Sequence, residues 1–187
     1  DIYVEANKAL EEDPSKKEQV TEIFKALEAQ RGEDVDLWKQ TRQWSIDLLH
    51  SVYDELNLTL EHWYFESQVI EKTKKIIDDL IKKEIVVESE GAWIVDLRDQ
   101  DLGVNLLIKS DGTLLYNAKD LGLAMKKEHD YHPVRSIYVV DVRQSHALKQ
   151  LFATLKLMNF DRELTHLSYD FVTLQDGAMA ARKGNVI

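Results

Sequence analysis

The sequence predicts an α/β fold in which a mainly helical N-terminal region precedes strands that include a parallel pair. Three observations support this fold class. Apolar residues recur at helical spacing up to about residue 82, the period then changes to strands separated by turns, and the last third alternates strand, helix and strand. The change of period predicts two parts: residues 1–96, which are helical and end in a β-hairpin, and residues 97–187, which carry the parallel strands.

The N-terminal region is expected to hold three main helices. Asp13-Pro14-Ser15 is a start signal, because a capping carboxylate precedes a proline at the first helical position, and Gly32 ends that helix. A second helix is expected over residues 36–56, with an apolar stripe that includes Trp44. A third is expected from residue 68 to residue 83.

Strand signals begin at residue 85. Residues 85–96 form a predicted hairpin around a Ser-Glu-Gly turn. A second hairpin is predicted over residues 106–116, because Asp111-Gly112 supplies the positive φ that a tight turn needs. A short helix is expected to follow over residues 118–127.

The last third is expected to contain a strand, a helix and a strand. The strands are predicted over residues 136–142 and 164–174, with an amphipathic helix over residues 146–158 between them. This order favours a right-handed crossover and a parallel pair.

Composition excludes several classes of protein. The 187 residues carry a formal net charge of −10, which argues against a general grip on DNA or RNA, because phosphate contacts need clustered Lys and Arg. No apolar run is long enough to cross a membrane. The absence of Cys excludes disulfides and thiolate metal sites, and it fits a cytoplasmic location.

Candidate binding residues gather where predicted strands end. Tyr116 and Asp120 are four residues apart, so one helical turn places both on one face. A carboxylate is the group that pairs with a guanidinium, while a phenol adds a hydrogen bond or a stacking face. Gln144 follows a buried strand, at the edge where open α/β sheets bind ligands. The alternative interpretation is that Asp120 caps a helix, Tyr116 belongs to the core and Gln144 is an ordinary capping residue.

The C-terminal segment adds a basic loop to this acidic chain. Residues 177–185 are small, bracketed by glycines, and carry Arg182 and Lys183 just past a strand. Such a loop suits closure over a phosphate-bearing ligand. Neither His146 nor His166 has a second ligand at metal-binding spacing, so no protein metal site is predicted.

Several segments, in this order and at sensible spacing, resemble arginyl-tRNA synthetase. The final loop is similar to the Lys-Met-Ser-Lys-Ser signature of class I aminoacyl-tRNA synthetases, followed by the Arg-Lys-Gly-Asn-Val-Ile of many arginine enzymes. The other segments are Asp1–Lys8, Leu37-Trp38, Tyr53–Asn57, Glu66-Ser67, Val87–Ala92, Lys109–Gly112, Leu115-Tyr116, Lys119-Asp120, Asp141–Gln144 and Gln150–Phe152.

The resemblance implies a Rossmann-like, doubly wound parallel sheet with a mainly helical insertion, and an enzyme that joins L-arginine to tRNA using ATP with Mg²⁺. It implies arginine binding by Tyr116, Asp120 and Gln144. The implied ATP-binding residues are His166 and Met179, and His146, one residue before the family's His position, is a further candidate. Arg182 and Lys183 are the nearest cations to the signature loop and are the candidate catalytic residues that stand in for its missing Lys. The family's first catalytic half and its tRNA-binding domains are not in this chain, so we expect an excised piece that is inactive alone and reaches tRNA through the full-length protein.

The sequence departs from the family pattern at the ATP subsite. Ala178, Ala180 and Ala181 replace signature-loop residues, Asp170 stands where the family usually has Gly, and Ala147 stands where it has His. These departures leave open a non-catalytic synthetase-like binding module that has lost ATP chemistry. They also leave open alanines introduced by hand into the loop.

Overall fold

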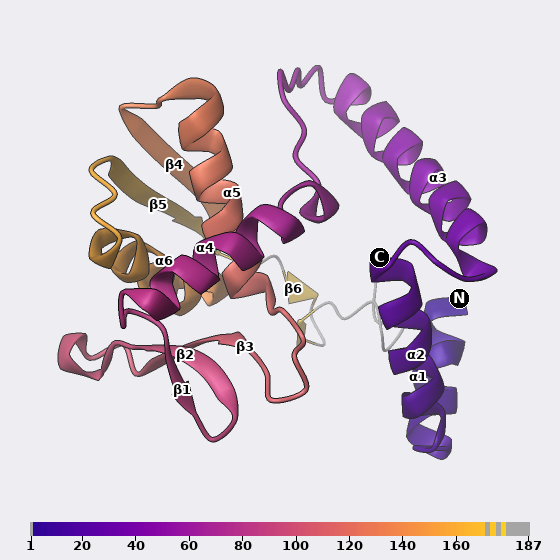
Figure 1. Ribbon diagram of the computed structural model, residues 1–187. Coiled ribbons are helices and arrows are strands. Elements are labelled where there is room, and N and C mark those ends of the chain that lie inside the picture. The colour runs from indigo at the N-terminus through magenta and orange to yellow at the C-terminus, as the bar shows by residue number, and fades with distance from the viewer. Residues whose placement is uncertain (1, 171–172, 175–176, 179–187) are drawn as a thin grey trace. The chain divides into compact units, whose positions relative to one another are not determined.

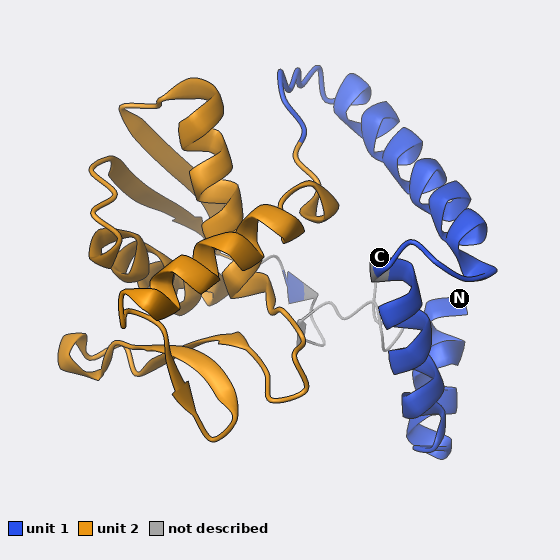
Figure 2. Ribbon diagram, viewed as in Figure 1, with its two compact units in different colours: residues 1–63, 172–187 blue, residues 64–171 orange. Residues whose placement is uncertain are grey.

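The computed structural model describes residues 2–170, 173–174 and 177–178, which form two compact units (Figures 1 and 2). One unit comprises residues 1–63 and 172–187, and the other comprises residues 64–171. The expected division at residue 96 falls inside the second unit, between two strands of one sheet.

The first unit is mainly helical. It contains α1 (Ile2–Glu12), α2 (Lys16–Glu28), α3 (Asp34–Glu55) and the short antiparallel strands β6 (Thr173–Leu174) and β7 (Gly177–Ala178). Helix α2 begins at Lys16 with Ser15 at the N-cap, so the expected start with Asp13 as the cap and Pro14 as the first helical residue is two residues too early. The Asp13 carboxylate instead accepts hydrogen bonds from the Ser15 backbone N–H and hydroxyl at 3.1 and 2.6 Å, which fixes the turn before the helix. The apolar stripe of α3 is largely exposed, and Trp44 retains 60% of its accessible surface.

The second unit begins with helices and an antiparallel sheet. A 3₁₀ turn, η1 (Glu66–Gln68), leads into α4 (Ile70–Lys82), and strands β1 (Val87–Ser89), β2 (Ala92–Asp96) and β3 (Val104–Ile108) pair in the order β1-β2-β3. A further 3₁₀ turn, η2 (Arg98–Gln100), connects β2 to β3. The hairpin predicted over residues 85–96 is therefore present, and β3 extends it by one strand.

The hairpin predicted over residues 106–116 is only partly formed. The Asp-Gly turn forms, with Gly112 at φ +81°, but the returning chain makes only one isolated bridge, between Ile108 and Leu114. Helix α5 (Tyr116–Tyr131) then begins two residues earlier than expected. The returning strand is short because Leu114 and Ala118 are buried, so the chain enters the core as helix α5 directly after Leu115.

The remainder of this unit contains the expected parallel pair. It runs through β4 (Arg135–Asp141), the 3₁₀ turn η3 (Val142–Gln144), α6 (Ser145–Leu157) and β5 (Glu163–Tyr169). β4 and β5 are parallel, with Arg135 opposite Glu163 and Asp141 opposite Tyr169. The sequence pattern predicted a strand that continues to residue 174, but β5 ends at Tyr169.

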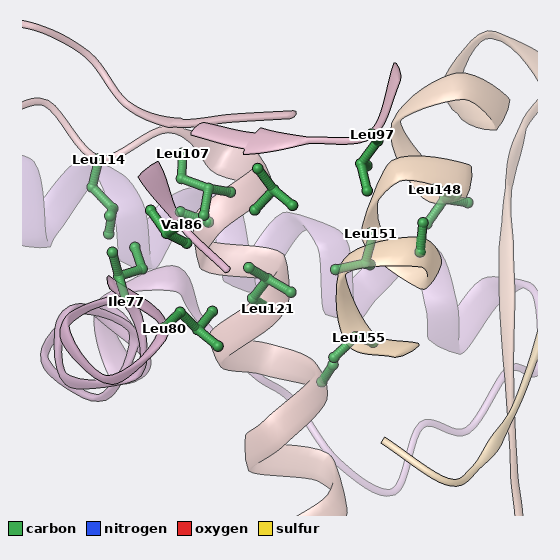
Figure 3. Close-up of a cluster of buried hydrophobic side chains, with 14 residues drawn as sticks. Ile77, Leu80, Val86, Leu97, Leu107, Leu114, Leu121, Leu148, Leu151 and Leu155 are labelled. Carbon is green, nitrogen blue, oxygen red and sulfur yellow. The ribbon is translucent and has the colours of Figure 1, made fainter. Parts of the chain in front are cut away.

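A single hydrophobic core joins α4, α5, α6 and the antiparallel sheet (Figure 3). Leu107 of β3, Leu121 of α5 and Leu155 of α6 have no accessible surface. Burial of one such side chain contributes about 1.5–3 kcal/mol. Two polar groups also fix α6 on β3: Gln150 donates to the carbonyls of Leu102 and Val104 at 2.8 and 3.0 Å, and Asn105 donates to Thr154 at 3.1 Å.

The crossing of α4 and α5 depends on Gly122. A Cβ at this position would stand 1.9 Å from the Oγ1 of Thr73, which is fully buried on α4. The helices can approach this closely only because residue 122 has no side chain.

The parallel pair has two different faces. Tyr138 and Val140 of β4 pack against the core, whereas the alternate residues point away from it. Ile137 and Val139 of β4 and Leu167 and Tyr169 of β5 keep between 55% and 60% of their accessible surface.

Candidate active site

The candidate arginine-binding residues lie near the carboxyl edge of the β4–β5 pair. Helix α5 and strand β4 run in opposite directions, since only residues 132–134 connect them (Figure 1). Lys127 lies over the ring of Tyr138, in the middle of β4. Asp120 precedes Lys127 by two helical turns, about 10 Å, and Asp141 follows Tyr138 by about 10 Å of strand. Asp120 is therefore level with the end of β4.

Tyr116 and Asp120 occupy the first two turns of α5. Tyr116 is the first residue of the helix and is about half exposed, at 52%. Asp120, one turn later, is half-buried. The chain thus presents an accessible phenol beside a carboxyl group that is partly withdrawn from water.

Asp120 has an unusual electrostatic environment. Burial, and then the nearby carboxylate of Glu66, raise the pKa of Asp120 to about 6, while the Lys127 ammonium acts in the opposite direction. Glu66 itself forms an ion pair with Lys119 at 2.8 Å. The ionised form of Asp120 is therefore poorly compensated, and a bound cation would stabilise it.

Asp141 behaves in the opposite way at the end of β4. Its carboxylate accepts from the Arg143 backbone N–H, Nε and Nη2 at 2.9, 2.9 and 3.0 Å. The Arg143 side chain is the main reason that the pKa of Asp141 is lowered. This ion pair fixes the η3 turn, so Asp141 is the structural carboxylate at this edge and Asp120 is the one suited to a ligand.

The other predicted site residues in the described chain are on η3, α6 and β5. Gln144 ends η3 and is exposed, and His146 is exposed in the first turn of α6. The His166 Nε2 lies 3.1 Å from the Val140 carbonyl of the neighbouring strand, which holds the ring against β4. Met179, Arg182 and Lys183 lie outside the described residues.

Two residues that act on these carboxylates were not among the predicted site residues. Lys127 acts on Asp120 from two helical turns away, and Arg143 fixes Asp141. The separation of Lys127 from Asp120 is a recognisable same-face signal on a helix, but many surface lysines share it. Only the burial around Tyr138 distinguishes Lys127 from them.

A pocket lies at the opposite edge of the parallel pair. It is lined by Met125, Glu128, Met158, Phe160 and Arg162, among others. Arg162 closes one wall by donating to both carboxylate oxygens of Glu128. This pocket is separate from Tyr116, Asp120 and Gln144.

Clusters of metal ligands and membrane-spanning helices would also bear on function, and both concern residues 2–170, 173–174 and 177–178. No group of three or more His, Cys, Asp or Glu side chains in these ranges is placed to hold a metal ion. No helix in the same ranges is long and apolar enough to cross a membrane.

An α/β domain with its polar side chains at the carboxyl ends of parallel strands is typical of nucleotide-binding enzymes. The family model described as tRNA synthetases class I (R), catalytic domain, matches residues 1–187, and the chain belongs to this family. An arginine–tRNA ligase of Bdellovibrio bacteriovorus is 39% identical over 194 residues, covering 100% of this chain and 33% of the relative. The chain thus spans about one third of the length of the curated relatives it matches.

Solved structures share the fold. The arginyl-tRNA synthetase of Plasmodium falciparum has a TM-score of 0.68 at 20% identity, covering 75% of this chain and 25% of that one. That of Thermus thermophilus has a TM-score of 0.64 at 23% identity, covering 92% and 36%. The predicted α/β synthetase fold with its helical region is confirmed.

Proposed function

We propose that this chain is the arginine-recognising portion of the catalytic domain of an arginine–tRNA ligase. The whole protein activates L-arginine with ATP and transfers it to tRNA for translation, in the cytoplasm. Family membership supports the reaction, and the observation that carries the assignment of the subsite is Asp120: a half-buried, poorly compensated carboxylate at the carboxyl edge, one turn from Tyr116.

The residues divide by chemistry. Asp120 pairs with the arginine guanidinium, Tyr116 contacts the same side chain, and Gln144 on η3 holds the amino acid from the end of β4. His146, His166 and Met179 contact ATP, which arrives with Mg²⁺ as part of the substrate rather than on a protein metal site. Arg182 and Lys183 stabilise the charge on the phosphates as pyrophosphate leaves.

Catalysis in this arrangement relies on alignment. Holding the arginine carboxylate against the α-phosphate of ATP replaces a bimolecular encounter, and fixed cations stabilise the charge that develops. The protein forms no covalent bond with the substrate. We propose residues 1–96 as the helical insertion region of this domain and residues 97–187 as its second half.

The test uses the full-length protein that contains this chain. Arginine-dependent aminoacylation and ATP–pyrophosphate exchange, with tRNA present, should both occur. Asp120→Asn should raise the KM for arginine about 100-fold or more, since removing one partner of a desolvated ion pair has a large effect on binding. The matched control is Asp99→Asn, an exposed carboxylate on η2, which should change the KM little.

A non-catalytic binding module is the second candidate, favoured by alanine at positions 178, 180 and 181 and by Asp170. Arginine binding without ATP–pyrophosphate exchange would support the module and exclude the ligase. Exchange that survives Asp120→Asn with an unchanged KM would instead refute the arginine subsite.

A further inference from the structure

Lys127 is placed to act on Asp120, in the candidate arginine subsite, from a position further along the same helix. It lies on α5, two turns after Asp120 and on the same helix face, and helical side chains point back toward the N-terminus. Its ammonium therefore extends toward Asp120. The Nζ lies 4.2 Å from the centroid of the Tyr138 ring, on a β4 residue that faces the core.

The site of Lys127 is partly desolvated. Burial lowers the pKa of Lys127, and Asp120 opposes this effect. Burial and the charge of Asp120 raise the pKa of Tyr138 to about 12, so Tyr138 stays neutral and offers the face of its ring. Lys127, Tyr138 and Asp120 therefore form one interacting group, contributed by α5 and β4.

The remaining charges near Asp120 come from η1 and α5. Glu66 raises the pKa of Asp120, and its carboxylate is bound by Lys119 at 2.8 Å. The adjacent Lys126 pairs with Asp130, also at 2.8 Å. Of the cations named here, Lys127 is the one whose charge lowers the pKa of Asp120.

We infer that Lys127 is a positioning residue which, seated on the Tyr138 ring, keeps the Asp120 carboxylate ionised and oriented to receive the guanidinium of arginine. The inference rests on the proposed function. A lysine suits this role because its ammonium acts as a point charge rather than as a bidentate donor. The Tyr138 ring keeps the ammonium away from the Asp120 oxygens, so both oxygens remain available to the planar guanidinium of arginine.

The experiment measures the dissociation constant of arginine by calorimetry, in the full-length protein, between pH 5.5 and pH 8. In the unsubstituted protein, affinity should fall as the pH drops through about 6, because Asp120 takes up a proton. Lys127→Met keeps most of the aliphatic stem and removes the charge, so this fall should begin about one pH unit higher. Arginine binding at pH 6 should then be roughly five-fold weaker than in the parent, and nearly equal at pH 8.

Two variants control for other effects. Lys126→Met removes a neighbouring charge that pairs with Asp130, and it should leave the pH midpoint of binding unchanged. Lys127→Arg restores a cation and should return the midpoint toward that of the parent. A role in packing alone would weaken binding equally at every pH.

The outcomes separate the two proposals. If Asp120→Asn abolishes arginine binding while Lys127→Met keeps the parental pH midpoint, Lys127 has no positioning role and the proposed subsite stands. If Asp120→Asn binds arginine as the parent does, both proposals fail. A raised midpoint in Lys127→Met that Lys127→Arg reverses establishes the inference.

Discussion

Replacing Asp120 by asparagine should stabilise the fold at neutral pH while it destroys arginine binding. The folded pKa of Asp120 is raised from 3.8 to about 6, so the folded state prefers the protonated carboxyl. The stability that this preference contributes is present below the unfolded pKa and is lost as the pH rises through about 6. Asparagine is neutral at every pH, and it removes this destabilisation.

The magnitude follows from the shift in pKa. A shift of about two units corresponds to at most about 3 kcal/mol. Solvent screening reduces this figure, because the side chain is only half-buried, and about 1 kcal/mol is a realistic expectation. In a chain of 187 residues such a change raises the Tm by about 2–4 °C.

Urea unfolding of the parent chain and of Asp120→Asn at pH 7.5 and pH 4.5 would measure this effect. The variant should be more stable at pH 7.5, and the difference should shrink to about one third at pH 4.5, where the folded Asp120 is protonated but the unfolded carboxyl, with a pKa of 3.8, is still mostly ionised. Asp130→Asn is a control of opposite sign: Lys126 and His129 lower the pKa of Asp130, so its loss should destabilise the fold at pH 7.5. An Asp120→Asn variant that is equally or less stable at pH 7.5 would refute the reasoning.

Three further substitutions test the fold around the site. Gly122→Ala should destabilise the chain by about 1–3 kcal/mol in urea unfolding, because its Cβ meets Thr73; a Thr73→Ala background should recover part of the loss. Asn105→Ala should lower the free energy of unfolding by about 1–3 kcal/mol in the same measurement, because the buried Thr154 loses a hydrogen-bond donor and Asn117 loses an acceptor. Arg162→Ala should move the urea midpoint little, since its ion pair with Glu128 is partly exposed, and any change should shrink further in high salt.

The sequence predicted the elements with strong periodicity. The predicted helix over residues 146–158 is α6 (Ser145–Leu157), and the parallel pairing of β4 with β5 followed from the order of strand, helix and strand. Such segments carry their own pattern, because one face is apolar and the other is not.

The second hairpin is only partly formed because a local turn signal does not report how far the returning strand extends. The turn at Asp111-Gly112 forms and the Leu115 backbone N–H donates to the Leu107 carbonyl, but α5 begins at Tyr116 and packs the buried Ala118 into the core. Core packing therefore ended the returning strand after a correct local turn signal.

The site shows the same limit. The spacing of Tyr116 and Asp120 predicts that they share a helix face, but periodicity carries no information about the burial around Asp120. The opposing effects of Glu66 and Lys127 arise from η1 and from a position two turns along α5, and they require the folded arrangement. The roles of Tyr116, Asp120 and Gln144 in binding arginine stay predictions.

The apolar outer face of the β4–β5 pair has a practical consequence for anyone who prepares this chain. Ile137, Val139, Leu167 and Tyr169 present a water-repelling strip on strands whose only described ladder partners are each other. Parallel strands in proteins are ordinarily sheltered on both sides. The chain by itself should therefore aggregate at high concentration, which light scattering would detect. Co-expression with the remaining two thirds of a full-length relative should reduce this aggregation.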